Sequence, residues 1–172
     1  MILFLSFVLI IILQRLVELY IAKRNKKILM NKGAVEYDRK GYFYIVFMHS
    51  AFFVSMILEY FLLDRNLNEY WTYLIIIFLL AQGLRYWAIV SLGTYWNTRV
   101  IVLNSSRAEV TGPYKFLRHP NYLAVSVEIA VIPLIFSCFI TAIIFSMINL
   151  VVLRRRIRIE ERALNIAVSS GT

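Results

Sequence analysis

The residues best suited to chemistry are an arginine and a histidine, Arg118 and His119, which directly precede a proline and a long apolar segment. Pro120 suits the first position of a helix, because the N–H group that proline lacks has no helical acceptor there. Gly112 and Pro113, a few residues earlier, are a turn signal. The free N–H groups and the dipole of a helix N-terminus attract anions. A cation and a titratable ring at such an N-terminus therefore predict a pocket for a carboxylate or a phosphate.

A second charged set follows the last apolar segment and contains Arg156, Glu160 and Glu161. The run has no helix-breaking residue, so we expect the last apolar helix to continue through it. Two interpretations are open. The set is either a solvated, salt-bridged helix end, or a pair of carboxylates that accept hydrogen bonds from an amine or hydroxyl of a ligand.

Three further ionisable residues lie in or beside apolar segments. An ionisable residue inside a membrane span is a candidate for function, and Arg85 and Glu128 fall inside two of the predicted spans. They either contact a substrate or pair with each other and hold the two spans together. Arg99, in the loop between these spans, contacts either lipid headgroups or the substrate.

Composition indicates the class of protein. The chain has 172 residues, of which 60% are hydrophobic, and carries a formal net charge of +9. Its mean hydropathy is +0.70, which is typical of a polytopic membrane protein of one domain. In this class a basic balance reflects cytoplasmic loops and anionic headgroups, so we expect no nucleic-acid partner. The single cysteine, Cys138, lies in an apolar run and excludes an intramolecular disulfide, and we expect no metal site.

Apolar segments predict an all-α fold of about five transmembrane helices, at residues 1–22, 42–63, 70–92, 121–136 and 139–153. The stretch from 121 to 153 holds one charged residue, Glu128. As one helix it would be about 50 Å long, well beyond a ~30 Å hydrocarbon core. We therefore expect a helical hairpin that turns within residues 133–141.

Charge distribution predicts the orientation. With five spans, the linker 23–40, the loop 93–120 (Arg99, Arg107, Lys115 and Arg118) and the tail 154–172 share one side with sixteen Lys and Arg, against Arg65 alone on the other. The positive side is expected to be cytoplasmic, with the N-terminus outside and the C-terminus inside. Four spans would place the arginine-rich tail outside. Both charged sets described above then face the cytoplasm.

The two sets together carry a family resemblance. The pattern GPYxxxRHPxY at 112–122, an apolar hairpin, and RxxxEExxL at 156–164 resemble the isoprenylcysteine carboxyl methyltransferase family and the related phospholipid methyltransferases. The resemblance covers roughly residues 84–164. Ala124 stands where the family usually has glycine, a small change that still allows close packing.

The resemblance implies a methyltransferase that uses S-adenosylmethionine and binds it through residues 93–164, at the cytoplasmic face of what we expect to be the plasma membrane. Carried over by position, the cofactor-binding residues are Arg118, His119, Pro120, Tyr122, Glu160 and Glu161. Arg156 is the candidate for orienting an anionic acceptor, and His119 is the candidate base for a hydroxyl acceptor. Arg99, Arg85 and Glu128 are the candidate substrate-binding residues.

A cytoplasmic cofactor pocket beside membrane helices suits a lipophilic acceptor that enters from the bilayer. The acceptor is expected to be a prenylcysteine-like carboxylate or a hydroxyl on a long-chain lipid, phenol or polyketide, and a small lipophilic acceptor is favoured. The alternatives are N-methylation of a phospholipid headgroup, a relative of the sterol-type reductases that uses NADPH, and a non-catalytic membrane scaffold.

Overall fold

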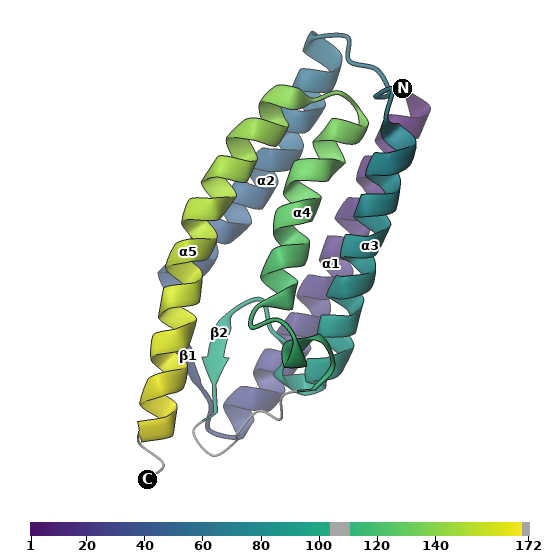
Figure 1. Cartoon of the computed structure of the whole chain (residues 1–172). Helices are drawn as coiled ribbons and strands as arrows, with labels where there is room; N and C mark the ends of the chain where they lie inside the picture. Colours follow the sequence, from purple (N-terminus) through teal and green to yellow (C-terminus); the bar gives the residue numbers. More distant parts are fainter. Residues whose placement is uncertain (104–110, 170–172) are drawn as a thin grey trace. The chain divides into compact units, whose positions relative to one another are not determined.

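The computed structural model describes residues 1–103 and 111–169 and is mostly helical (Figure 1). The elements in chain order are α1 (Ile2–Asn31), β1 (Val35–Tyr37), α2 (Arg39–Leu62), α3 (Trp71–Leu92), the short 3-10 helix η1 (Gly93–Tyr95), β2 (Val100–Val102), the 3-10 helix η2 (Gly112–Lys115), α4 (Pro120–Ile135) and α5 (Phe139–Ser169). Arg107, counted above among the loop cations, lies outside the described residues.

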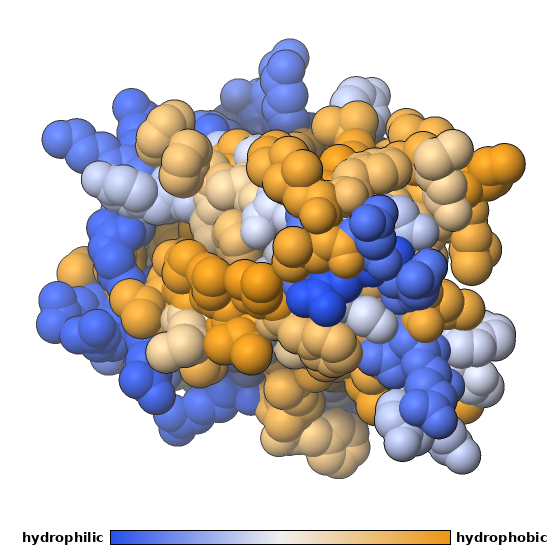
Figure 2. All heavy atoms as spheres, turned by 90° about the horizontal axis from the view of Figure 1, so that it is seen from above, coloured by the Kyte–Doolittle hydropathy of each residue, from blue (hydrophilic) through white to orange (hydrophobic). Residues whose placement is uncertain are grey.

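Three helices of the described chain are long and apolar enough to cross a membrane: α1, α2, and α3 together with η1. Helix α4 has 16 residues and a length of about 24 Å, which is short of a ~30 Å hydrocarbon core. The uncharged part of α5 ends at Leu153, since three arginines follow it. Large hydrophobic side chains are exposed along the helices, such as Leu80 at 70%, and they make up much of the face in Figure 2. The count of five spans and the orientation of the termini stay predictions.

The helical hairpin was predicted closely. The break between α4 and α5 falls at Phe136–Cys138, inside the expected interval, and α5 continues without interruption through Arg156 to Ser169. Ser137 turns the chain with a positive φ of 55°. The main-chain N–H groups of Ser137 and Cys138 donate to the oxygens of Leu134 and Pro133.

Two expectations need correction. Helix α1 does not end near Ala22 but runs on to Asn31, because Asn25 and Leu29 continue its buried stripe. It ends two residues before Gly33, whose φ of +84° is the left-handed conformation that favours glycine after a helix. The fold is also not purely helical, because β1 and β2 form a two-stranded antiparallel sheet.

The chain divides into two compact units, and each is described by itself. The sheet unit consists of Met1–Phe43, Leu92–Glu109 and Arg155–Thr172, and the hairpin unit consists of Tyr44–Ser91 and Val110–Arg154.

In the sheet unit, the two strands pack against the end of α5. Val35 pairs with Val102, and Tyr37 pairs with Val100. Val100 and Val102 are buried with Ala163 of α5, and Tyr37 packs against them. The sheet is short, so this apolar contact with the helix supplies the burial that two isolated strands lack.

In the hairpin unit, α2 packs along the first half of α5. The hydroxyls of Ser55 and Thr141 lie 3.0 Å apart, and the rings of Phe52 and Phe145 meet edge to face at 5.6 Å. The carboxylate of Glu59 accepts the main-chain N–H of Thr141 at 2.7 Å. Glu59 thereby satisfies a donor that the first turn of a helix otherwise leaves unpaired.

Helix α4 packs in the same unit against both α5 and α3. Asn149 of α5 donates to the hydroxyl of Ser126 at 3.2 Å, and that hydroxyl donates to the carbonyl of Tyr122 at 2.9 Å. Arg85 of α3 forms a salt bridge with Glu128 of α4. Polar side chains therefore tie three helices together within an otherwise apolar interior.

Candidate functional site

The N-terminus of α4 forms where the sequence predicts it. Pro120 is the first helical residue and is buried, and His119 precedes it as the cap residue. The main-chain oxygen of His119 accepts the N–H groups of Tyr122 and Leu123 at 3.1 and 3.2 Å. The motif residues therefore lie on the first turn of a helix and on the residues that lead into it.

The turn ahead of this helix depends on glycine. Gly112 has a φ of +56°, and a Cβ atom at this position would collide with the side chain of Ser91. Thr111 next to it donates its hydroxyl to the carbonyl of Ser91 at 3.1 Å. The turn is thus fastened to the end of α3, and both its backbone conformation and its close approach require glycine.

Side chains of three kinds surround the N-terminus of α4. The ring of His119 stacks on that of Tyr122, with centroids 5.3 Å apart and planes inclined by 21°. Arg118 is exposed. The Oδ1 atom of Asn121 is buried and has no hydrogen-bond partner among the described residues, so it can accept from an amine or hydroxyl. A cation beside an unused acceptor suits a ligand that carries both a carboxylate and an ammonium group.

Asn121 was not among the predicted site residues. Its signal is present in the sequence, because it is a polar residue on the first turn of an otherwise apolar helix. An asparagine there is usually interpreted as solvated. Only the structure shows that the amide oxygen is buried without a partner.

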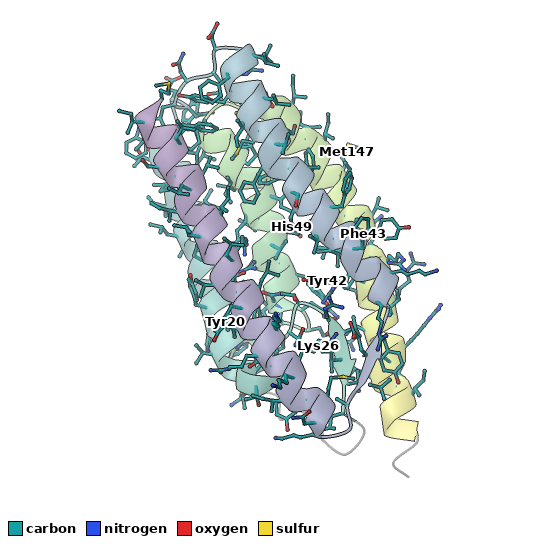
Figure 3. All side chains as sticks on the ribbon, turned by 180° about the vertical axis from the view of Figure 1, so that it is seen from behind. Tyr20, Lys26, Tyr42, Phe43, His49 and Met147 are labelled. Carbon is teal, nitrogen blue, oxygen red and sulfur yellow. The ribbon has the colours of Figure 1, made fainter. Side chains whose placement is uncertain are left out.

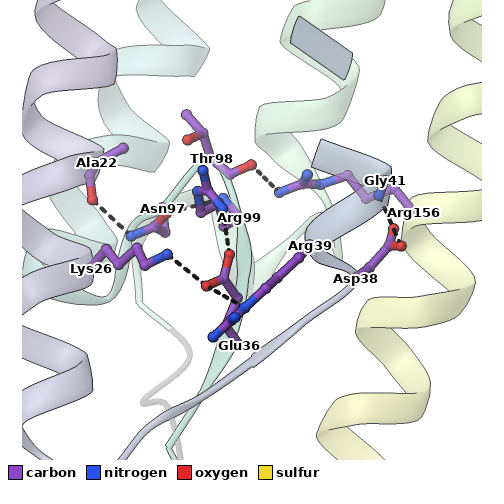
Figure 4. Close-up of polar contacts among 10 residues, drawn as sticks. All are labelled: Ala22, Lys26, Glu36, Asp38, Arg39, Gly41, Asn97, Thr98, Arg99 and Arg156. Atoms are coloured by element: carbon purple, nitrogen blue, oxygen red, sulfur yellow. Dashed lines mark hydrogen bonds and ion pairs between the residues drawn. The ribbon is translucent and has the colours of Figure 1, made fainter. Parts of the chain in front are cut away.

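The second motif lies on α5, in the sheet unit. Arg156 is buried and donates from Nη2 to the main-chain oxygen of Thr98 at 2.7 Å (Figure 4). Glu160 and Glu161, one turn further on, are partly exposed. His119 and its neighbours belong to the hairpin unit, so the structure describes the two motifs separately. Their joint role in one pocket stays a prediction.

The loop that receives Arg156 is fastened on its other side to α1. Asn97 donates its amide N–H to the carbonyl of Ala22 at 2.9 Å, and its Oδ1 accepts the main-chain N–H of Arg99 at 3.0 Å. Asn25 donates to the carbonyl of Trp96 at 2.8 Å. Residues 96–99 are therefore held by side chains from two helices.

Arg99, a predicted substrate-binding residue, is already engaged within its own unit. Its Nη1 lies 2.5 Å from a carboxylate oxygen of Glu36, and its guanidinium carbon lies 3.8 Å from the centroid of the Tyr42 ring. The second contact is a cation–π interaction at close range. A role in binding the acceptor stays a prediction for this residue.

Glu36 on β1 is the residue that sequence reasoning missed most completely. Besides Arg99, its side chain binds Lys26 at 2.6 Å and Arg39 at 3.4 Å, although it is only 1% exposed. Burial raises the pKa of this carboxyl, but the hydrogen bonds from Lys26 and Arg99 outweigh burial and hold the pKa below its usual value. No sequence signal marks Glu36, since its three partners come from three separate segments.

The predicted pairing of Arg85 with Glu128 is present. Nη1 of Arg85 donates to Oε2 of Glu128 at 3.0 Å, and the two side chains are 6% and 1% exposed. The pair joins α3 to α4, as one of the two interpretations of these residues required. Substrate contact by either residue remains a prediction.

Comparison with known proteins gives a family and two relatives. Residues 74–166 match the model of the isoprenylcysteine carboxyl methyltransferase (ICMT) family. The chain is 40% identical over 155 residues to the uncharacterized protein YpbQ of Bacillus subtilis (strain 168), across 90% of this chain and 92% of YpbQ. It is 27% identical over 152 residues to an uncharacterized protein of Haemophilus influenzae, across 88% of each chain. No solved structure gives a significant match.

Proposed function

The chain belongs to the isoprenylcysteine carboxyl methyltransferase (ICMT) family, and we propose that it transfers a methyl group from S-adenosylmethionine to a lipophilic acceptor at the cytoplasmic face of the membrane. Family membership and three long apolar helices support assignment as a membrane methyltransferase.

The observation that carries the proposal is the set of groups around the N-terminus of α4. S-adenosylmethionine has a carboxylate, an ammonium group and ribose hydroxyls. Arg118 or His119 meets the carboxylate, and Asn121 supplies an unused buried acceptor for the ammonium group or a hydroxyl. Glu160 and Glu161 are the further acceptors that the family motif provides.

The chemistry requires chiefly that the acceptor be held in line. When bound, the cofactor would supply a methyl group on a sulfonium, whose carbon–sulfur bond would leave its electron pair on sulfur. An acceptor oxygen within reach forms the new bond, and alignment is the protein's main contribution to the rate. Arg156, which donates to the carbonyl of Thr98, is the residue we propose to orient an anionic acceptor by its charge.

We favour O-methylation of a hydroxyl on a small lipophilic molecule over methylation of a carboxylate. A carboxylate needs no base, whereas a phenol or enol must lose its proton as the bond to carbon forms. His119 is the base we propose for this step, because it is the imidazole of the motif at the N-terminus of α4. The methyl ester of a prenylcysteine-like acceptor is the other O-linked product.

The test is to incubate membranes that contain the protein with S-adenosylmethionine labelled in the methyl group. We expect label in the lipid extract, stable to mild base if the product is an ether and released by base if it is an ester. Label on the amine of a lipid headgroup would show that the reaction is N-methylation and not O-methylation. Absence of protein-dependent transfer to any fraction, with saturable binding of NADPH instead, would overturn the proposal.

Binding to purified protein gives the matched residue test. We expect His119→Ala and Glu161→Ala each to abolish saturable binding of S-adenosylmethionine while the protein keeps its elution volume and helical content. Arg162→Ala is the control, because Arg162 is an exposed neighbour on the same helix. Normal binding by both site variants would show that the cofactor binds elsewhere.

A further inference from the structure

Three cations converge on one carboxylate in the sheet unit. Lys26 comes from α1, Arg39 from the start of α2, and Arg99 from the loop before β2, and all three reach Glu36 (Figure 4). One negative charge cannot balance three positive ones. Asp38, a carboxylate two residues along the chain, is already bound by both terminal nitrogens of Arg155, at 2.8 and 3.0 Å. The cluster therefore keeps an excess of positive charge.

The cations stay accessible although the carboxylate that orders them does not. The side chains of Lys26, Arg99 and Arg39 are 31%, 28% and 76% exposed, against 1% for Glu36. Tyr42 fixes the guanidinium of Arg99 from one face. This arrangement positions donors in advance at a place that an anion can reach from outside, which reduces the ordering cost of binding.

The charge of the whole chain is concentrated in the same unit. The sheet unit has fourteen Lys and Arg residues against six Asp and Glu, so it accounts for +8 of the chain's formal charge of +9. The hairpin unit has five against four. A surface this basic attracts anionic lipid headgroups and interacts with them more strongly at low ionic strength.

The surroundings of the cluster indicate a membrane interface. On α1, the exposed Tyr20 separates the apolar part of the helix from the basic part that contains Lys26. At the start of α2, Arg39 is followed by Tyr42 and by the exposed Phe43 (Figure 3). Aromatic side chains between apolar and basic residues mark the headgroup layer of a bilayer.

From these observations we infer that Lys26, Arg39 and Arg99, ordered by Glu36, bind the phosphate of an anionic membrane phospholipid. The inference stands on the charge and geometry of the sheet unit alone and is independent of methyl transfer. Glu36 has the role of holding the three cations close together around one carboxylate. Without a carboxylate between them, they would repel at this spacing.

The experiment measures lipid binding by the full-length protein in a neutral detergent. Mixed micelles containing phosphatidylglycerol are titrated, and binding is followed by native mass spectrometry. We expect saturable binding that weakens with salt, and at most weak binding of phosphatidylcholine. Equal binding of both lipids would overturn the inference.

Arg39→Gln and Lys40→Gln form the matched pair of variants. Both remove one positive charge from an exposed position at the start of α2, but only Arg39 has an ion pair with Glu36. We expect Arg39→Gln to weaken phosphatidylglycerol binding about fivefold, since one cation at an anionic surface contributes about that much. Lys40→Gln should change it less than about twofold. Equal losses in both variants would show attraction by overall charge and no site.

A further variant and a competing anion test the inference independently. Arg99→Gln should weaken binding at least as much as Arg39→Gln, and its elution volume and helical content are measured in parallel as a check on folding. Inorganic phosphate is added as a competitor. Displacement of the lipid by phosphate at low millimolar concentration would show that the site takes a free anion, and would overturn the assignment to a lipid.

Discussion

Nη2 of Arg156 lies 2.7 Å from the main-chain oxygen of Thr98, which ties the second family motif to the loop that follows α3. Thr98 is itself placed by Asn97, whose amide group binds the carbonyl of Ala22. The position of the motif arginine therefore depends on three segments that are distant in the sequence. These contacts fix the position and the direction of the Arg156 side chain, in addition to the charge that it carries.

Arg156→Lys is predicted to lower the rate of methyl transfer about 100-fold, because a small misplacement of an orienting group has an effect of that size. A lysine keeps the charge but cannot both bond to Thr98 and present a planar guanidinium. Initial rates with labelled cofactor, compared with cofactor affinity from calorimetry, measure the effect. Arg158→Lys, at an exposed position two residues on, should be neutral. A wild-type rate in Arg156→Lys would remove this residue from the proposed mechanism.

Removal of one partner of the Arg85–Glu128 pair is predicted to lower the stability of the folded protein. Arg85→Met leaves a carboxylate buried among apolar helices and should lower the free energy of unfolding by about 3–5 kcal/mol. The double variant Arg85→Met, Glu128→Leu should recover most of this loss, since no unpaired charge remains. Unfolding of the purified protein by increasing amounts of SDS in mixed micelles measures both. Additive losses in the double variant would mean that the residues do not act as a pair.

Glu59 is predicted to stabilise the beginning of α5. Glu59→Ala removes a charged acceptor from the N–H groups of Ile140 and Thr141 and should cost about 2–3 kcal/mol in the same unfolding assay. Glu59→Gln keeps one acceptor oxygen and should cost less. Glu69→Ala, at an exposed position in the following loop, is the control. Equal stability of the alanine variants at 59 and 69 would contradict this role.

Stability should depend on pH through Glu36. Because its pKa is lowered in the folded protein, the ionised carboxylate stabilises the fold above its ordinary pKa of 4.5, and this contribution is lost as the pH falls below that value. The unfolding midpoint of the wild type should therefore decline between about pH 5 and about pH 3. The decline should be steeper than that of Glu36→Gln. Parallel curves for the two proteins would show that Glu36 does not titrate with folding.

The helices were predictable because their signals are local. Apolar runs with charges at their ends place α2, α3 and α4 within a few residues, and Pro120 marks the start of α4. The break near Ser137 follows from the length of the apolar stretch. The pairing of Arg85 with Glu128 was one of two open interpretations, and the high cost of an isolated charge in an apolar interior is its physical reason.

The sheet unit was less predictable because its order arises from long-range contacts. Val35 pairs with Val102, which lies far from it in the sequence. Neither strand is long enough to show an alternation of apolar and polar residues. The lysine-rich end of α1 resembles a linker in composition. Only its buried positions, Asn25 and Leu29, indicate a helix, and their partners are not visible in the sequence.

Because α5 is one continuous helix, the number of residues between two of its side chains sets the angle between them about the helix axis. Asn149, Arg156 and Ala163 are each seven residues apart and share one face. Asn149 donates to the hydroxyl of Ser126, and Arg156 donates to the carbonyl of Thr98. Ala163 is buried with Val100. Arg156 and Ala163 both lie in the sheet unit, and one inserted residue between them would turn Ala163 by about 100° about the helix axis relative to Arg156. The contacts of these two residues are therefore linked by an angle as well as a length, and a single insertion between them is incompatible with keeping both contacts.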